Sequence, residues 1–475
     1  MDKNISFKVY FVIMNKTYDK KGFLEAILGK IGIKGERATV LDIEAIRNEL
    51  IDSLVYNSLF NEDTSIKSAS RWLIREIGYN LGIIPSSIYP FYAEKGEGKF
   101  PNITVPAINI RGLTYDTARA VFSASKIANS FLFIFEIARS EMEYTEQSGD
   151  EYATSIIGAG IKEGISFPVF IQGDHFQIRR KIPQDIENVK ALIKDVIEAG
   201  FYNIDLDTSV LVDLSQPNVY EQQRNNFTSA AELTEYIRKI EPKGINVSLG
   251  GEIGEIGGKN SNEEELREYM RGYLEEIKKR GINIGISKMA VQTGTVHGGI
   301  PLPSGGVADV KLDFNTLDVL SRVSKEYKLA GTVQHGASTL PLELFNKFPE
   351  TDVCEVHLAT EFQNMVYNLI PDDFREKIYS YLKEACKKEM KEEETETQFL
   401  YKTRKKGFGP FKKEFFELDE EIKKNIREKL SEKFLEIFKL LKVDNTDKLT
   451  SLFKPLYYPK PFPEILKQWE ELLPH

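Results

Sequence analysis

Short apolar runs alternate with longer amphipathic stretches through the middle of the chain. The runs are rich in β-branched and aromatic residues, which predicts strands, and the stretches between them have helical spacing, as in Asp185–Ala199 and Glu263–Arg280. Helices of that length can cross back over a sheet, so the strands are expected to pair in parallel. The predicted strands are Ile103–Asn109, Phe131–Ile137, Val169–Gly173, Asn203–Asp207, Asn246–Gly251, Gly285–Val291, Gly331–Gln334 and Val353–Leu358.

Eight strand and helix units predict an α/β fold, a closed (β/α)8 TIM barrel over residues 101–370. A doubly wound open sheet is the alternative architecture. Both arrangements place chemistry at the carboxyl ends of the strands.

Two further segments flank the predicted barrel. Residues 1–100 mix helical patterns, such as Ala69–Leu81, with strand-like pieces, and predict an N-terminal α/β addition. Residues 371–475 are rich in Lys and Glu and predict a C-terminal helical extension with one helix around Glu420–Leu441.

Composition narrows the class of protein. With 475 residues, 41% hydrophobic and 28% charged, the chain is expected to be globular, and it has no apolar run of the ~20 residues that span a bilayer. The net charge of -9 gives no electrostatic reason to expect a nucleic acid or a membrane as partner. No secretion signal is visible, and Cys354 and Cys386 form no CxxC pair, so a cytoplasmic protein is expected.

Three of the chain's five histidines follow predicted strands. His175, His297 and His335 would therefore meet at one mouth of the barrel. Three neutral imidazole nitrogens with an open position are the ligand set of a catalytic zinc ion. The pattern predicts a metal site with these three ligands.

Acidic residues and glycines accompany these histidines. Asp174 precedes the first of them and could donate and accept a proton once a metal polarises a carbonyl. Gly298 and Gly336 follow the other two, and glycines there allow backbone N–H groups to approach an anion such as phosphate. Asp207 and Glu252 also end predicted strands.

Structural roles are open for several of these positions. Asp207 and Glu252 could stabilise loops rather than a metal site, and Ser338 could cap a helix, which is compatible with binding phosphate at the same helix end. His357 lies inside an apolar run and could be a hydrogen-bonded core residue.

Six motifs occur along the predicted barrel at spacings that fit its strands. They are Val105-Pro106-Ala107-Ile108-Asn109, Gly173-Asp174-His175, Asp207-Thr208-Ser209, Gly251-Glu252-Ile253-Gly254-Glu255-Ile256-Gly257-Gly258, Gly294-Thr295-Val296-His297-Gly298 and His335-Gly336-Ala337-Ser338. Each is weak alone. In this order, over residues of about 103 to 365, they resemble the class II, metal-dependent fructose-bisphosphate and tagatose-bisphosphate aldolases.

The resemblance implies Zn²⁺ or another divalent transition metal on His175, His297 and His335. It implies that Asp174 takes and returns the proton of the substrate's C4 hydroxyl, while two acids lie beside the metal or at a second metal position, Asp207 and Glu252. It also implies contacts to substrate and phosphate, assisted by a monovalent cation, from Asn109, Gly298, Gly336, Ser338 and Thr360.

The chain departs from the family pattern at several positions. Lys259-Asn260 stands where the family carries an acidic pair in a loop, and Glu263–Glu265 could substitute. Ala138 aligns with a phosphate-binding serine, and His357 and Ala359 stand where the family presents an asparagine and an aspartate. Recognition of two phosphates is therefore in doubt.

The first expectation is an aldehyde-lyase of carbohydrate metabolism and glycolysis, acting as a homo-oligomer. It would reversibly cleave a phosphorylated ketose of the fructose- or tagatose-bisphosphate type to dihydroxyacetone phosphate and an aldehyde. The alternatives are a ketose or ketose-phosphate C4-epimerase using the same retro-aldol step, a zinc hydrolase and a non-catalytic aldolase partner subunit. The basic segment Lys402–Lys413 could reach the phosphate site of a neighbouring subunit.

Overall fold

Eight parallel strands form the centre of the molecule in a computed structural model that describes residues 17–179, 183–254, 259–294 and 312–467. Each strand is buried along its whole length, as is usual where helices cover a parallel sheet. The strands are β4 (Val105–Asn109), β5 (Ile134–Ala138), β6 (Val169–Asp174), β7 (Asn203–Asp205), β8 (Ser248–Glu252), β9 (Lys288–Val291), β10 (Thr332–Gln334) and β11 (Glu355–Leu358).

The sheet closes on itself. β11 pairs with β4, placing Glu355 opposite Val105, and β6 pairs with β7, placing Gln172 opposite Asn203. The predicted (β/α)8 barrel is confirmed, and the open sheet is wrong.

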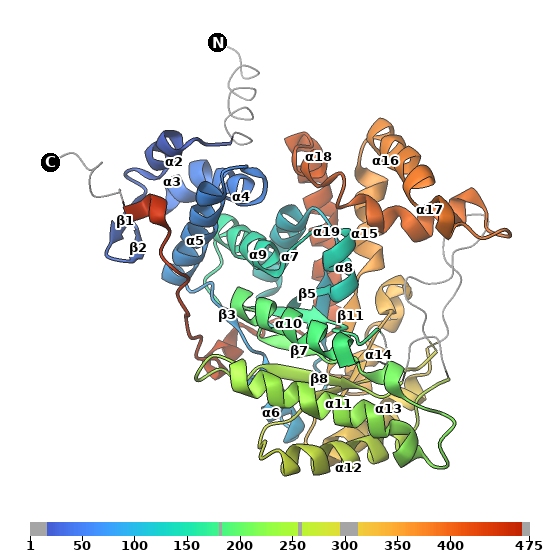
Figure 1. Ribbon diagram of the computed structural model, residues 1–475. Coiled ribbons are helices and arrows are strands. Elements are labelled where there is room, and N and C mark those ends of the chain that lie inside the picture. Colours follow the sequence, from blue (N-terminus) through green and yellow to red (C-terminus); the bar gives the residue numbers. More distant parts are fainter. Residues whose placement is uncertain (1–16, 180–182, 255–258, 295–311, 468–475) are drawn as a thin grey trace.

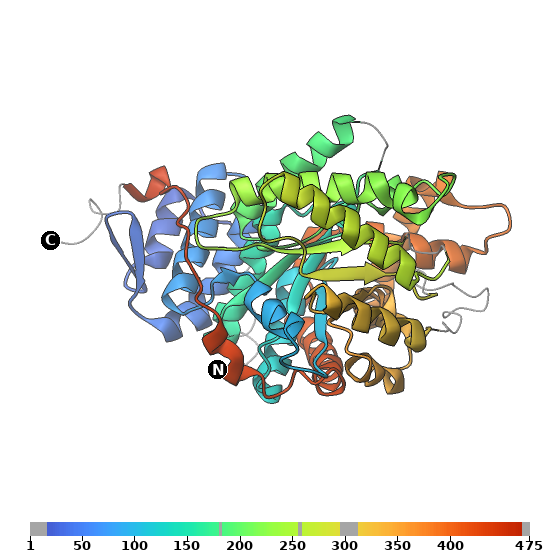
Figure 2. The ribbon, with the colours of Figure 1, turned by 90° about the horizontal axis from the view of Figure 1, so that it is seen from below.

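Helices surround the barrel, as the two views at right angles show (Figures 1 and 2). The chain enters α12 through a capping box, in which Asn262 and Glu265 satisfy each other's backbone N–H groups. The helices that follow the strands are α7 (Thr114–Ala128), α8 (Arg139–Tyr144), α9 (Gly149–Glu163), α10 (Pro183–Ala199), α11 (Val219–Ile240), α12 (Glu263–Lys279), α13 (Phe314–Glu326), α14 (Lys347–Glu350) and α15 (Thr360–Leu369).

The N-terminal segment packs on one side of the barrel. Its helices α4 and α5 contact α9, and the short strand β3 joins the sheet beside β6, with Pro85 opposite Val169. Its elements are α2 (Lys20–Ile27), β1 (Ile31–Lys34), β2 (Arg37–Val40), α3 (Ile43–Ala45), α4 (Ile51–Phe60), α5 (Thr64–Asn80), β3 (Pro85–Ser86) and α6 (Tyr89–Gly96).

The C-terminal extension is helical, as predicted, and begins beside α15. Its longest helix packs against α7 and α15, while the shorter helices lie together at upper right in Figure 1. Its elements are α16 (Asp372–Ala385), α17 (Glu396–Thr403), the 3-10 turn η6 (Arg404–Gly407), α18 (Lys412–Phe416) and α19 (Glu420–Leu440).

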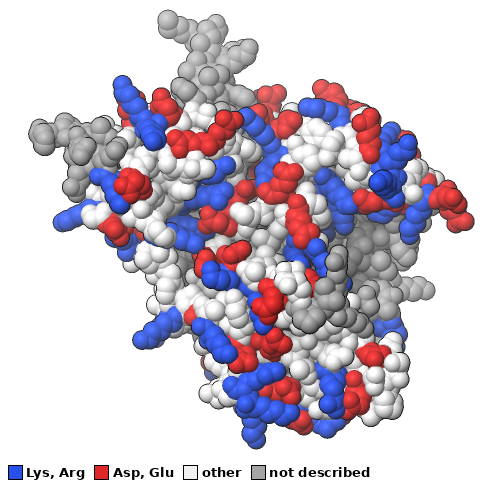
Figure 3. All heavy atoms as spheres, viewed as in Figure 1, with Lys and Arg blue, Asp and Glu red and all other residues white. Residues whose placement is uncertain are grey.

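One hydrophobic core runs from the N-terminal helices through the barrel to the extension. The division at residues 100 and 370 therefore stays a prediction. On the face in Figure 3, acidic and basic side chains are interspersed. Among the described helices, none has the length and apolar character needed to cross a membrane.

Candidate active site

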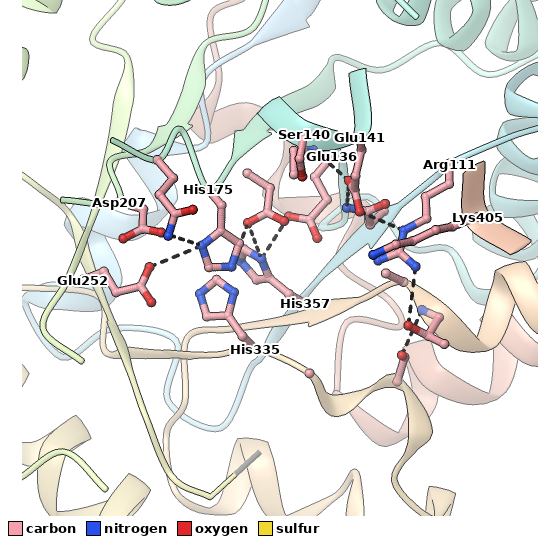
Figure 4. A pocket seen from close by; sticks show the side chains of 18 of the residues that line it. Arg111, Glu136, Ser140, Glu141, His175, Asp207, Glu252, His335, His357 and Lys405 are labelled. Atoms are coloured by element: carbon pink, nitrogen blue, oxygen red, sulfur yellow. Dashed lines mark hydrogen bonds and ion pairs between the residues drawn. The ribbon is translucent and has the colours of Figure 1, made fainter. Parts of the chain in front are cut away.

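Five predicted residues meet where the strands end. Asp174 ends β6 and His175 follows it, while Asp207 follows β7, Glu252 ends β8 and His335 follows β10. All five line a cavity of about 300 Å³ (Figure 4). The predicted grouping of these side chains at the mouth of the barrel is therefore present in the structure.

Ligand atoms in this group are close enough to share one ion. Those of Asp174, His175 and His335 lie within 4.8 Å of one another, and so do those of His175, Asp207 and Glu252. The rings of His175 and His335 have centroids 4.2 Å apart. Imidazole nitrogens with carboxylate oxygens beside them are donors typical of divalent transition metals, so the residues fit such an ion.

His175 joins the two groups through a left-handed backbone conformation, with φ of +41°. Few non-glycine residues adopt this conformation, and it recurs at functional sites. It places Nδ1 of His175 3.3 Å from Asp207 Oδ2 and 3.4 Å from Glu252 Oε2. The hydroxyl of Ser209 donates to the other oxygen of Asp207 at 2.7 Å, which fixes that carboxylate.

The acids outnumber the cations at this end of the cavity. Burial opposes charge on His175, yet Asp174 and Glu252 raise its pKa well above the ordinary value. Burial and the Asp207 carboxylate raise the pKa of Glu252 to about 7. Burial alone would raise the pKa of Asp207, but hydrogen bonds from His175 and Ser209 lower it. The excess of carboxylate favours a bound cation.

The predicted ligand His297 and the predicted phosphate contact Gly298 lie outside the described residues. Their roles stay predictions.

The predicted substrate contacts line the same cavity. Nδ2 of Asn109 donates to Glu141 at 2.6 Å, while Oδ1 accepts no hydrogen bond from the described residues. Gly336 has a φ of +70°, which glycine adopts without strain. Ser338 Oγ accepts from the backbone N–H of Thr360 at 3.1 Å, so its own hydroxyl hydrogen remains available to a ligand. Ser338 thus caps α15 at the edge of the cavity.

The structure shows the contacts of several positions where the chain departs from the family pattern. Ala138 lines the cavity, and its backbone N–H donates to Glu141 at 2.8 Å. Glu265 belongs to the capping box of α12 and pairs with Lys259 at 2.7 Å. Glu263 pairs with Arg267. Among the described residues that line the cavity, none comes from Glu263–Glu265.

His357 belongs to the site, which sequence reasoning left open. Its Nδ1 lies 3.2 Å from Asp174 Oδ1 and 3.1 Å from Glu136 Oε2. Burial opposes its charge, but Glu136 and Asp174 raise its pKa well above the ordinary value. His357 therefore orients the carboxylate of Asp174. The alternation along β11, which turns every second side chain into the barrel, is the signal that could have shown this.

Below the mouth, the barrel interior holds a buried ion pair. Lys288 Nζ lies 2.8 Å from both Asp205 Oδ1 and Gln172 Oε1, and it also contacts Glu355. Burial would lower the pKa of Lys288, but Asp205 and Glu355 raise it. Lys288 thus stays protonated and is unsuited to forming a Schiff base.

The opposite end of the cavity carries cations that sequence reasoning missed. Arg111 follows β4, and Lys405 comes from η6 of the C-terminal extension. Arg404 belongs to the basic segment that could reach a neighbouring subunit. It is buried, contacts Asn364 and is not among the described residues that line the cavity. The extension therefore contributes to the cavity of its own chain.

The family model for class-II fructose-bisphosphate aldolase matches residues 98–406. The chain belongs to this family, whose members are generally metal-dependent. No match to the chain is found among curated protein sequences.

Solved structures that are similar to the chain share little sequence with it. The fructuronate-tagaturonate epimerase UxaE from Cohnella laeviribosi is 13% identical, with a TM-score of 0.55, over 88% of this chain and 90% of that one. Fructose-bisphosphate aldolase from Campylobacter jejuni is 16% identical, with a TM-score of 0.45, over 77% and 98%. The YdjI aldolase from Escherichia coli is 14% identical, with a TM-score of 0.46, over 76% and 99%.

Proposed function

We propose that the protein is a divalent-metal-dependent enzyme that interconverts the C4 epimers of a 2-keto sugar. It would break the bond between C3 and C4, turn the aldehyde and reform the bond. One observation supports this most strongly. The carboxylate of Asp174 lies against the imidazoles of His175 and His335, and the C-terminal extension supplies part of the cavity wall through Lys405.

Asp174 is the proposed acid and base. Its carboxylate takes the proton of the C4 hydroxyl, the C4–O electrons form the aldehyde carbonyl, and the C3–C4 pair remains on C3 as an enolate. A cation held by His175 and His335, with His297 as the third proposed ligand, would polarise the C2 carbonyl. On re-addition the carboxyl returns its proton to the new C4 oxygen.

The contribution of the C-terminal extension to the cavity wall supports epimerisation over release of fragments. An aldolase must let the aldehyde leave between turnovers, whereas an epimerase must hold it while its plane turns by half a turn. The cavity of about 300 Å³ lies at the lower end of the roughly 300–1,000 Å³ common for small-molecule sites, which suits one six-carbon chain.

We infer the substrate class from a structural neighbour whose match extends over most of this chain, beyond the barrel. UxaE is named for fructuronate and tagaturonate, and its fold is shared over 88% of this chain. These two keto-sugar acids differ in configuration at C4. We take a hexulosonate pair of this kind as the substrate class.

Release of dihydroxyacetone phosphate and an aldehyde is the second candidate. The family match and the position of Gly336 and Ser338 at the cavity favour it. The departure at Ala138 opposes binding of two phosphates. A non-catalytic partner subunit is disfavoured because Asp174, His175 and His335 are retained and lie together.

A carbon-13 NMR time course with metal-loaded protein tests the proposal. Fructuronate, tagaturonate, fructose 1,6-bisphosphate and tagatose 1,6-bisphosphate would each be supplied, with and without a chelator. We expect chelator-sensitive formation of the C4 epimer from either hexulosonate, with no free fragments. Free trioses from a bisphosphate, with no epimer from either hexulosonate, would favour the aldolase instead.

The same experiment in D₂O tests the bond that breaks. Retro-aldol cleavage keeps the C4 hydrogen on carbon, so the product should carry no deuterium at C4. Deuterium at C4 would contradict the proposed step.

A further inference from the structure

Two cations stand at the end of the cavity opposite the acidic cluster. Figure 4 shows Arg111 and Lys405 beside one another at right, and Asp207 and Glu252 at left. Both cations line the cavity, and Arg111 is mostly buried, with 14% of its side chain exposed. The charge of the cavity therefore changes from acidic to basic along its length.

Arg111 is held in a fixed orientation. Its Nε donates to Glu141 Oε1 at 2.7 Å, and its Nη1 donates to Gln363 Oε1 at 3.0 Å. Within the described part of the chain, its Nη2 donates no hydrogen bond to protein. The guanidinium thus keeps one amino group available to a ligand.

Glu141 neutralises only one of the two cations. Besides pairing with Arg111, it accepts from Asn109 Nδ2 at 2.6 Å and from the backbone N–H of Ala138 at 2.8 Å. Across residues that the structure describes, Lys405 has no carboxylate at ion-pair distance. The charges of Arg111, Glu141, Lys406 and Glu389 act on it from farther away, and the ring of Tyr144 lies 5.6 Å from its Nζ. This end of the cavity has two positive charges and one negative charge.

Close backbone packing fixes Lys405 in place. A Cβ on Gly112 would lie 2.0 Å from the ring of Phe408, and one on Gly409 would lie 2.6 Å from the carbonyl oxygen of Tyr144. Only glycine permits these approaches of the extension to the barrel. Burial, and then the charge of Arg111, lower the pKa of Lys405, which is the cost of holding two cations together.

We propose that Arg111 and Lys405 bind the anionic end group of the keto sugar and so select its class. The inference rests on the proposed function and deepens it. A terminal carboxylate supplies the single negative charge that balances this end of the cavity, and the planar guanidinium suits a carboxylate. A terminal phosphate would use the same donors, so the test separates the two.

The direct test is Lys405→Met, with Lys406→Met as the matched control. Lys406 is the next residue, pairs with Glu389 at 2.7 Å and does not line the cavity among the described residues. We expect Lys405→Met to raise KM for a hexulosonate at least tenfold with little change in kcat, and to raise KM for uncharged fructose or tagatose much less. Lys406→Met should behave like wild type.

Lys405→Arg keeps the charge and should restore most of the lost affinity, which a role in packing alone would not predict. An equal change for charged and uncharged ketoses, or no change for either, would overturn the inference. Circular dichroism of each variant shows that it is folded.

Calorimetric titration separates this inference from the proposed function, because it needs no turnover. Gluconate, sorbitol 6-phosphate and uncharged sorbitol would be titrated into metal-loaded protein. We expect gluconate to bind more tightly than sorbitol, and Lys405→Met to weaken gluconate at least tenfold. If sorbitol 6-phosphate binds more tightly than gluconate, and Lys405→Met loses this affinity, the anion subsite stands and its ligand is a phosphate. Equal binding of all three would overturn it even if the enzyme epimerises ketoses.

Discussion

Two levels of the barrel interior are both rich in carboxylates and differ in how these charges are balanced. In the lower level, Lys288 is surrounded by Asp205, Glu355 and the amide of Gln172, so the chain supplies both signs of charge. At the mouth, the carboxylates outnumber the imidazoles around His175. The lower level thus holds a cation supplied by the chain itself, whereas the upper level gains from a bound cation.

The pKa directions express the same contrast. Burial would raise the pKa of Glu355, but Lys288 lowers it, so both members stay ionised. Glu252 at the mouth has a pKa of about 7 because burial and Asp207 oppose its charge. Glu355 keeps its charge because Lys288 lies beside it, whereas Glu252 is shifted towards neutrality because it is buried beside Asp207.

Removing a proposed metal ligand at the mouth should have the largest effect on metal binding and activity. We expect His335→Ala to lose most of its bound metal and nearly all activity, a larger effect than the roughly 10–100-fold that loss of an outer partner costs. Elemental analysis after purification gives the metal content. Wild-type metal content in His335→Ala would remove this residue from the ligand set.

Asp174→Asn should separate chemistry from metal binding. We expect kcat to fall by about 10²–10⁴-fold with metal content largely kept, since the amide cannot accept the C4 hydroxyl proton. Steady-state kinetics and elemental analysis on the same preparation check this. Unchanged turnover would exclude Asp174 as the base.

Lys288→Met should destabilise the lower level. Glu355 and Asp205 would be left buried without their cation, and loss of one partner of a buried pair costs about 3–5 kcal/mol. We expect Tm to fall by several degrees in calorimetry. Lys279→Met removes an exposed pair with Glu276 and should leave Tm unchanged; equal shifts in the two variants would contradict the contrast.

The pH dependence of metal binding gives the smallest effect. Below a pKa of about 7, Glu252 is protonated in the metal-free protein and a metal must displace that proton, so the apparent affinity should fall as pH falls. Protonation of Glu252 lowers the apparent affinity for the metal by at most about tenfold per pH unit, and this effect disappears above pH 7. Titration between pH 6 and 8 checks this. Glu252→Gln should flatten the slope, leaving the part due to His175.

The pattern of apolar runs in the sequence predicts both the barrel and the site residues at the ends of its strands. Asp174, Asp207, Glu252 and His335 directly follow apolar runs, so their position at the strand ends could be inferred from the pattern alone. His357 lies within such a run, where alternation decides whether a side chain faces the cavity or a helix.

Lys405 could not be found in this way, whereas Arg111 follows β4 as Asp207 follows β7 and could have been. Lys405 lies in η6 and reaches the cavity only because the extension folds back over the barrel. Pairing residues so far apart depends on tertiary packing, about which local periodicity carries no information. The basic segment can be recognised in the sequence, but its position beside the cavity depends on contacts such as that of Gly112 with Phe408.

The placement of Lys405 has a consequence for how such enzymes diversify. The residues for bond chemistry lie on barrel strand ends, and one proposed determinant of substrate class lies on an appended segment. Insertions or exchanges in the coding sequence after the barrel can therefore alter which sugars are accepted while the reaction stays the same. Grafting the segment around Lys405 onto a related barrel, together with Gly112 to seat it, is a rational route to new ketose specificity.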